Sequence, residues 1–347
     1  MINKKENKKL KNEKTLYLIK TNGKYGYIDN TGEICIEPVF EYAGDFIGPL
    51  AVISVSDKFG FINKDGEIVA KPIYDDTFDF SNGFSVVQQS EKVGYVNAEG
   101  ILAIPAKFDD ANDFSEGLAA IKIGCKWGYI NEQGEMVIAP QFLDAFDFSE
   151  GLALVQSGGK LGYINKNADF VIEPKYDFAF GFSEGYAAVQ ISSNYGYIDK
   201  KGKMVINPIY YTANDFSESL AAVELADKYG FISENGEMVI PNQYDWADNF
   251  YEGYATVAIG EKYGFIDKDG KEFIPIKYDN VDSISEGLIS VEIDGKWGYI
   301  DKDCNIIVTP IFDEVSKFID GTAKVVFENR IRYINKTGEY IWNNSKN

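Results

Sequence analysis

The chain has 347 residues, of which 45% are hydrophobic and 15% aromatic, and its formal charge is −20. It contains no histidine, which excludes Ser-His-Asp and Cys-His nucleophiles and the common histidine zinc sites. A body this acidic repels nucleic acid and anionic lipid, so we expect neither as a partner. A basic partner or a small cationic ligand is more compatible with this charge.

The N-terminus differs from the rest of the chain in composition. Its first 15 residues hold six lysines against two glutamates and lack the apolar stretch of a signal peptide. No run elsewhere is apolar and long enough to span a membrane. The sequence therefore predicts a disordered lysine-rich tail over residues 1–15, a repeat array over 16–342, and a second disordered tail over 343–347. We expect a cytoplasmic protein.

A glycine recurs every 34 residues through nearly the whole chain, and this period defines the architecture. Tyr or Phe always follows it, and Ile or Val comes next. A turn glycine, a proline and a Phe-Ser-Glu-Gly-like segment keep the same phase. The recurring glycines are Gly26, Gly60, Gly94, Gly128, Gly162, Gly196, Gly230, Gly264 and Gly298, and Arg332 takes the position in a tenth, degenerate copy.

Each unit begins with a pattern typical of a β-hairpin. In residues 289–301, an Asp-Gly pair separates two β-prone runs, which is a strong signal for a two-residue turn. That turn places Val291 opposite Gly298 and Ile289 opposite Ile300. We interpret the glycine as leaving room for the neighbouring valine.

A third strand is predicted after the next turn. A type I turn with Gly270 in the left-handed region would place Ile274 opposite Gly264 and Phe273 opposite Phe265. A proline is then expected to end the strand by withholding a ladder donor. The return segment is expected to be an irregular loop or a single helical turn, with almost no true helix in the chain.

These columns resemble the WG-repeat family, also called KWG repeats, whose units contain the run Lys-Trp-Gly-Tyr-Ile-Asp. The closest copies are the six residues from Lys126 and the six from Lys296. The resemblance covers roughly residues 16 to 342. It implies tandem β-units in a family widespread in bacteria, and it implies an architecture more than an activity.

A three-stranded unit of 34 residues cannot bury two apolar faces alone, so neighbouring units must stack. We predict an all-β, open, superhelical, solenoid-like array of three-stranded antiparallel repeats. The alternative is a closed, propeller-like ring. Ten blades exceed the usual four to eight, three strands are fewer than the usual four, and the atypical copy with Arg332 suits a cap on an open end.

The aromatic column before the repeat glycine is the most attractive predicted binding surface, because exposed rings stack on sugars, bases or proline-rich peptides. The competing interpretation, which we favour, is that these rings pack between adjacent units. The candidate binding residues are Trp127, Trp297, Tyr195, Tyr229 and Tyr263.

Carboxylates also recur, as Asp113 and Glu116 illustrate, and they suit either a ladder of calcium sites or turn chemistry. Turn chemistry is favoured, with Asp bonding to backbone and Glu facing solvent, because no dense Asp-x-Asp loop is present. We predict no metal, no cofactor and no catalytic residue.

The sequence thus favours a non-catalytic scaffold that binds a protein or peptide, in an oligomeric state that it does not determine. The alternative is a carbohydrate- or small-ligand-binding module that uses exposed aromatics. A carboxylate-based hydrolase is much weaker, because no unit carries a unique polar insertion.

Overall fold

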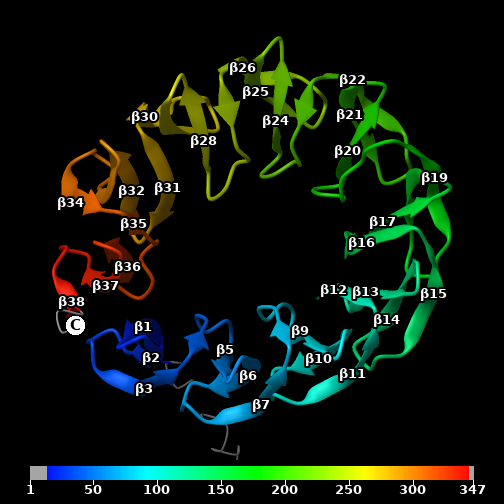
Figure 1. The fold of residues 1–347 in the computed structure, drawn as a ribbon. Coiled ribbons are helices and arrows are strands. Elements are labelled where there is room, and N and C mark those ends of the chain that lie inside the picture. The colour runs from blue at the N-terminus through cyan, green and yellow to red at the C-terminus, as the bar shows by residue number, and fades with distance from the viewer. Residues whose placement is uncertain (1–13, 344–347) are drawn as a thin grey trace, which may run out of the picture.

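The computed structural model describes residues 14–343, and over that range it is all-β without any helix. Ten antiparallel sheets follow one another along the chain and close into a ring (Figure 1). Each sheet runs from an inner first strand to an outer last strand, so the fold is a ten-bladed β-propeller. Most of the two predicted tails, residues 1–13 and 344–347, lie outside the described range.

The strands are grouped here by blade. Blades 1 to 3 are β1 (Tyr17–Thr21), β2 (Lys24–Ile28) and β3 (Ile34–Phe40); β4 (Tyr42–Ala43), β5 (Leu50–Val55), β6 (Lys58–Asn63) and β7 (Ile68–Tyr74); and β8 (Asp76–Thr77), β9 (Phe84–Gln89), β10 (Lys92–Asn97) and β11 (Leu102–Phe108). Blades 4 and 5 are β12 (Asp110–Ser115), β13 (Leu118–Ile123), β14 (Lys126–Asn131) and β15 (Met136–Phe142); and β16 (Asp144–Ser149), β17 (Leu152–Ser157), β18 (Lys160–Ile164) and β19 (Phe170–Tyr176). Blades 6 and 7 are β20 (Tyr186–Ile191), β21 (Asn194–Asp199) and β22 (Met204–Tyr210); and β23 (Thr212–Ala213), β24 (Leu220–Leu225), β25 (Lys228–Ser233) and β26 (Met238–Tyr244). Blades 8 to 10 are β27 (Trp246–Ala247), β28 (Tyr254–Ile259), β29 (Lys262–Asp267) and β30 (Glu272–Tyr278); β31 (Asn280–Ser285), β32 (Leu288–Ile293), β33 (Lys296–Ile300) and β34 (Ile306–Phe312); and β35 (Glu314–Val315), β36 (Thr322–Phe327), β37 (Arg330–Asn335) and β38 (Tyr340–Asn343).

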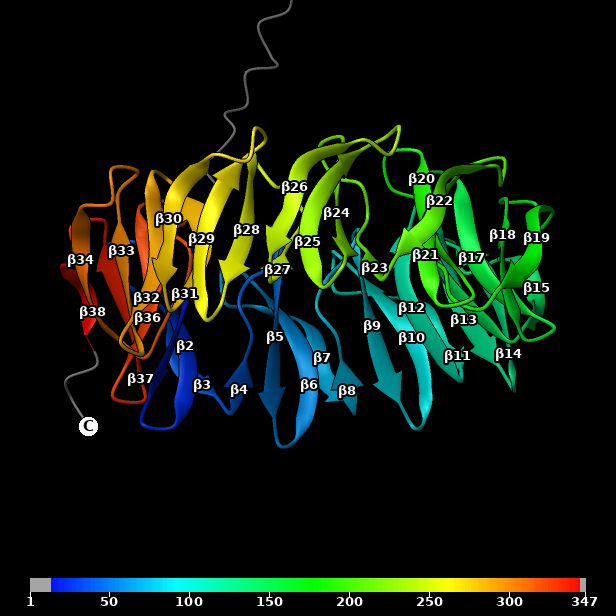
Figure 2. The ribbon, with the colours of Figure 1, turned by 90° about the horizontal axis from the view of Figure 1, so that it is seen from above.

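The predicted open array is therefore wrong, and the closed ring is the arrangement found (Figures 1 and 2). The return segment, expected to be a loop, supplies a short inner strand such as β4, which pairs with β5 through Tyr42–Ser54 and Ala43–Ile53. Eight of the ten blades consequently have four strands. The sequence pattern conceals this strand because it is only two residues long in several blades.

The last copy closes the ring instead of capping an open end. The Tyr333 hydroxyl of blade 10 donates to the Leu18 carbonyl of blade 1 at 2.6 Å, and the Tyr17 hydroxyl donates to the Ile319 carbonyl at 2.8 Å. The rings of Tyr17 and Tyr333 lie 5.4 Å apart between centroids. No strand is shared across this closure, because blade 1 begins at β1 and blade 10 ends at β38.

The hairpin register is confirmed, whereas the outer register is shifted by one residue. Val291 lies opposite Gly298 as predicted. On the outer side, however, Phe265 lies opposite Ile274, and Gly264 faces a bulge in β30. A Cβ on Gly264 would lie 2.5 Å from the Ile274 carbonyl oxygen. The glycine thus makes room for backbone and not for a valine side chain.

The repeat prolines lie inside the outer strands instead of ending them. Pro140 belongs to β15, and its nitrogen would lie 2.7 Å from a Cβ on Gly128. A proline suits this bulge because its missing N–H leaves no ladder donor to satisfy.

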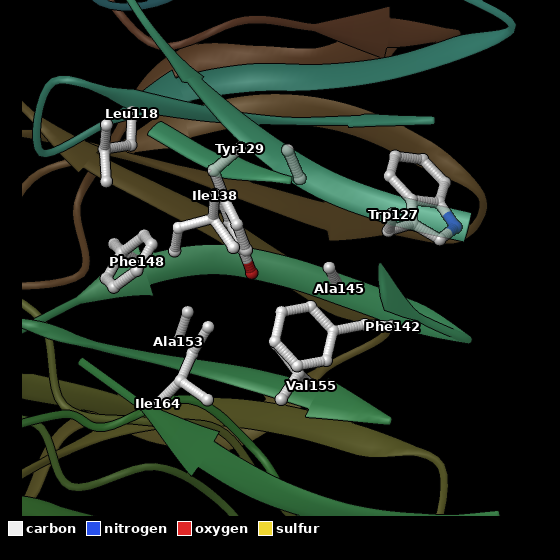
Figure 3. Close-up of a cluster of buried hydrophobic side chains, with 11 residues drawn as sticks. Leu118, Trp127, Tyr129, Ile138, Phe142, Ala145, Phe148, Ala153, Val155 and Ile164 are labelled. Atoms are coloured by element: carbon white, nitrogen blue, oxygen red, sulfur yellow. The ribbon is translucent and has the colours of Figure 1, made fainter. Parts of the chain in front are cut away.

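Neighbouring blades bury each other's faces, as the stacking argument predicts. Between blades 4 and 5, Tyr129 and Ile138 pack against Ala153, Val155 and Ile164 (Figure 3). Small side chains on the face of one blade pack against large side chains on the facing blade, so the two sheets interdigitate closely. The ten units are therefore one cooperative ring of shared cores.

Polar contacts also join successive blades. The Tyr129 hydroxyl of blade 4 donates to the Phe146 carbonyl of blade 5 at 2.8 Å. The Glu116 carboxylate accepts from the Gly151 N–H at 3.1 Å and pairs with Lys166 at 3.2 Å, both in blade 5. The interpretation of the repeat glutamates as solvent-facing is therefore wrong for Glu116, which holds the next blade.

Acid should weaken these seams. The pKa of Asp245 is lowered by its hydrogen bond from Lys228 and further by the Gly260 N–H. Such a carboxylate stabilises the fold above its unfolded-state pKa of about 4, and this contribution is lost as the pH falls below that value. We expect a lower urea midpoint at pH 3 than at pH 7. Asp245→Asn should show a shallower pH dependence than the unchanged chain, and an identical dependence in both proteins would contradict this assignment.

Candidate functional site

The five aromatic residues predicted as binding residues lie in the cores between blades and do not form one site. Trp127 is only 8% exposed and packs with Phe142 and Val155 (Figure 3). The other four are half-buried, each packed against a different inter-blade core: Tyr195, Tyr229, Tyr263 and Trp297.

One rim of the ring carries the two-residue hairpin turns, such as Gly124–Cys125, and is called here the hairpin face. In seven blades, a lysine at the start of the second hairpin strand pairs with a carboxylate that follows the outer strand. Asp109 shows the arrangement: it pairs with Lys92 of blade 3 and accepts from the Gly124 N–H of blade 4 at 2.6 Å. Glu41, Asp75, Asp245, Asp279 and Asp313 likewise accept from a backbone N–H of the next blade and so tie two blades together.

Seven seams have this lysine–carboxylate pair. The pairs are Lys24–Glu41, Lys58–Asp75, Lys92–Asp109, Lys160–Asp177, Lys228–Asp245, Lys262–Asp279 and Lys296–Asp313.

Two seams lack the pair and expose an apolar side chain in its place. Leu143 stands at the carboxylate position between blades 4 and 5, and Lys126 forms no ion pair with a described residue. Tyr211 stands there between blades 6 and 7, where Asn194 replaces the lysine. Leu143 is 46% exposed and Tyr211 is 66% exposed. Neither side chain reproduces the anchoring role of Asp109.

Phe178 joins these two residues in a series over three successive blades. It stands one position after the carboxylate Asp177, at the entry to blade 6, and is 61% exposed. Leu143, Phe178 and Tyr211 are called here the blade 5–7 patch. Ile123 and Ile191, both exposed, are the last residues of β13 and β20, directly before the hairpin turns of blades 4 and 6.

The side chains of the blade 5–7 patch are exposed and do not belong to the buried core. Scattered exposed apolar residues are ordinary, whereas a contiguous exposed apolar patch marks an interaction surface. Leu143 and Tyr211 also cannot make the two contacts that Asp109 makes in its seam, one with a lysine and one with a backbone N–H. At Leu143 and Tyr211 the seam contacts are thus replaced by exposed side chains, in the sector of the ring that also carries Phe178.

Comparison with known proteins identifies the family. The sequence profile described as "WG containing repeat" matches nine consecutive segments that together run from residue 25 to 330: 25–59, 59–92, 94–127, 127–160, 162–195, 195–229, 229–263, 263–297 and 297–330. The chain belongs to the WG-repeat family. The WG-repeat sequence matches none of the curated proteins compared with it.

Solved structures resemble this WG-repeat protein in fold alone. One described as a eukaryotic initiation factor is 11% identical, covers 95% of this chain and 98% of its own, and superposes with a TM-score of 0.54. Dihydro-heme d1 dehydrogenase NirN is 12% identical, covers 93% of this chain and 75% of its own, and has a TM-score of 0.42. These identities are too low to transfer a function.

Other site types find little support within residues 14–343 of the WG-repeat protein. That range contains no group of three or more His, Cys, Asp or Glu side chains placed to hold a metal ion. It also has no helix that could cross a membrane.

Sequence reasoning missed the blade 5–7 patch although its signal was present. The repeat places Asp or Glu one residue after the outer strand in seven units, and only Leu143 and Tyr211 depart from this in the described seams. These two departures are inconspicuous in the sequence, because the aromatic column is far more regular.

Proposed function

We propose that this WG-repeat protein is a non-catalytic scaffold that binds a protein partner through the blade 5–7 patch. The observation that carries the proposal is the replacement of seam ion pairs by exposed Leu143 and Tyr211, with Phe178 between them. Lys126, left without a carboxylate, lies beside this apolar surface. The partner surface that suits it combines apolar side chains with a carboxylate.

The carbohydrate alternative is not favoured. It required the aromatic column to be exposed, and Trp127 is buried while Tyr195, Tyr229, Tyr263 and Trp297 are covered in part by the next blade. A ring packed against protein on one face cannot offer that face to a sugar.

The test restores the residue that the repeat itself uses. Leu143→Asp with Tyr211→Asp should leave the fold at least as stable, because the carboxylate introduced at position 143 would meet Lys126 as Asp109 meets Lys92. A partner isolated with the native chain and then purified should bind the double variant about tenfold more weakly or worse, as expected when interface anchors are lost. Val39→Asp with Ile73→Asp, on the exposed sides of β3 and β7, adds the same charge and is the matched control, which should bind normally.

Two results would reject the proposal. One is a purified partner that binds the double variant as tightly as the native chain. The other is equal weakening by Val39→Asp with Ile73→Asp, which would show that the added negative charge matters and not the place where it is added.

A further inference from the structure

The inside of the ring carries a second surface, distinct from the hairpin face. The first strand of each blade lies nearest the ring centre (Figure 1). Two consecutive residues at or just after these strands, or at the corresponding position of blade 6, which has no short inner strand, form what is called here the inner rim. From blade 3 to blade 9 they are Phe78–Asp79, Asn112–Asp113, Phe146–Asp147, Phe180–Gly181, Asn214–Asp215, Asp248–Asn249 and Asp282–Ser283.

The inner rim is acidic, and its charge is not neutralised by the protein. Its six aspartates form no ion pair with any residue of the described range, in contrast to the aspartates of the hairpin face. The Asn112 side chain donates to Asp147 at 3.3 Å, which brings the carboxylates of blades 4 and 5 close together. Burial, and then repulsion by Asp147, raises the pKa of Asp113. Asp113 and Asp147 are thus held together without a counter-charge among the described residues, whereas Lys317 of blade 10 lines the same hollow as Asp248 and Asp282.

Aromatic rings stand beside these carboxylates and are exposed. Phe78 is 59% exposed, Phe146 is 43% and Phe180 is 45%. Phe78 borders a hollow of ≈ 310 Å³ whose other lining residues include Val86, Asn112, Asp113 and Asp147. An exposed aromatic ring next to two carboxylates suits a planar organic cation, because the ring face and the carboxylates both attract positive charge.

We propose that the inner rim of blades 3–5 binds an arginine-containing basic segment of a protein partner, with one guanidinium over Phe78 and against Asp113 and Asp147. Arginine suits the hollow better than lysine, because its flat fork stacks on a ring while it donates to two carboxylates. The aspartates recur about once per blade, so a further basic side chain of the same segment would meet Asp215 of blade 7. The acidic rim repels nucleic acid, which leaves a basic polypeptide as the matching polymer.

The proposal is independent of the blade 5–7 patch, which lies on the hairpin face and is apolar. Either surface can function without the other. The experiment therefore uses a defined probe and not the partner assumed for the patch.

The test measures the binding of fluorescent hexa-arginine, hexa-lysine and hexa-glutamate peptides to the full chain by anisotropy, at low and physiological salt. We expect hexa-arginine to bind more tightly than hexa-lysine and hexa-glutamate not to bind. Asp113→Asn with Asp147→Asn should weaken hexa-arginine binding about tenfold or more. Phe78→Ala, at an exposed position that the fold tolerates, should reduce the preference for arginine over lysine.

The matched control changes the same net charge elsewhere. Asp57→Asn with Asp227→Asn alters two exposed hairpin turns at φ of 58° and 60°, a conformation that asparagine adopts readily. This pair should change hexa-arginine affinity by no more than about twofold, through the general field alone. Equal weakening by both pairs, no binding of hexa-arginine, or equal affinity for the arginine and lysine peptides would each overturn the proposal. Leu143→Asp with Tyr211→Asp should leave hexa-arginine binding intact.

Discussion

Gly128→Ala should destabilise the ring by about 3 kcal/mol or more, toward the upper end of what overpacking costs. A Cβ at this position would lie 2.4 Å from the Ile138 carbonyl oxygen and 2.7 Å from the Pro140 nitrogen. Both atoms are backbone in the adjacent outer strand, so no side chain can rotate away to relieve the clash. Urea denaturation followed by tryptophan fluorescence would measure the loss.

The control for this substitution is another glycine with ordinary space around it. Gly181→Ala meets nothing closer than the Ser149 Cβ at 4.0 Å, and its φ is not positive. It should change stability by less than about 0.5 kcal/mol. Equal losses at both glycines would mean that the close backbone approach is not what excludes a side chain at position 128.

Arg332 explains why one blade tolerates a side chain at this position. In blade 10, Arg332 lies opposite Asn343 and Tyr333 lies opposite Trp342, so β38 has no bulge facing the position of the glycine. The guanidinium lies 4.7 Å from the centroid of the Phe327 ring. The glycine is thus required by the bulge and not by the hairpin.

Deletion of blade 10, residues 314–347, should convert the ring into a self-associating open form. The deletion exposes Tyr299 and Val308 of blade 9 and Tyr17 and Ile28 of blade 1, which blade 10 covers in the intact protein. One chain would then carry two complementary apolar faces, which leads to head-to-tail association. Light scattering after gel filtration should show an apparent mass that rises with concentration, to roughly twice that of one chain or more.

Tyr333→Phe is a smaller change at the same closure. It removes only the hydrogen bond to the Leu18 carbonyl and should cost about 1 kcal/mol while the ring stays closed. A truncated chain that remains monomeric at every concentration would show that the exposed faces of blades 9 and 1 do not associate.

The local fold could be predicted from the sequence wherever a short turn fixes the pairing. A two-residue turn leaves one register for its hairpin, which is why the pairing of Val291 with Gly298 is predicted correctly. The outer strand has a bulge opposite the glycine, and a bulge adds a residue that periodicity cannot reveal. Pro105 and Pro140 occupy different positions in their units, yet Gly94 and Gly128 face the same kind of bulge.

Ring closure could not be predicted because it depends on the rotation between neighbouring blades. That rotation is set by how side chains such as Tyr129 and Ala153 interdigitate, and the repeat period contains no information on it. The inner strands were missed for a related reason, since two residues such as Tyr42 and Ala43 are too few to show alternation.

The candidate surfaces were hidden for a different reason. The aromatic column is conspicuous in the sequence because every unit needs a large side chain for packing. The blade 5–7 patch and the inner rim are visible only once the structure shows which positions face solvent. Leu143 and Phe78 look like ordinary core residues until their exposure is known.

Because no strand is shared where the ring closes, the polypeptide need not begin and end at this seam. The contact between the last and first blades is of the same kind as that between blades 4 and 5, with a tyrosine hydroxyl bonded to the next blade's backbone. The ends of the polypeptide could therefore be placed between any two blades. A circularly permuted gene that starts at blade 6, with a short linker joining the present termini, should yield the same propeller.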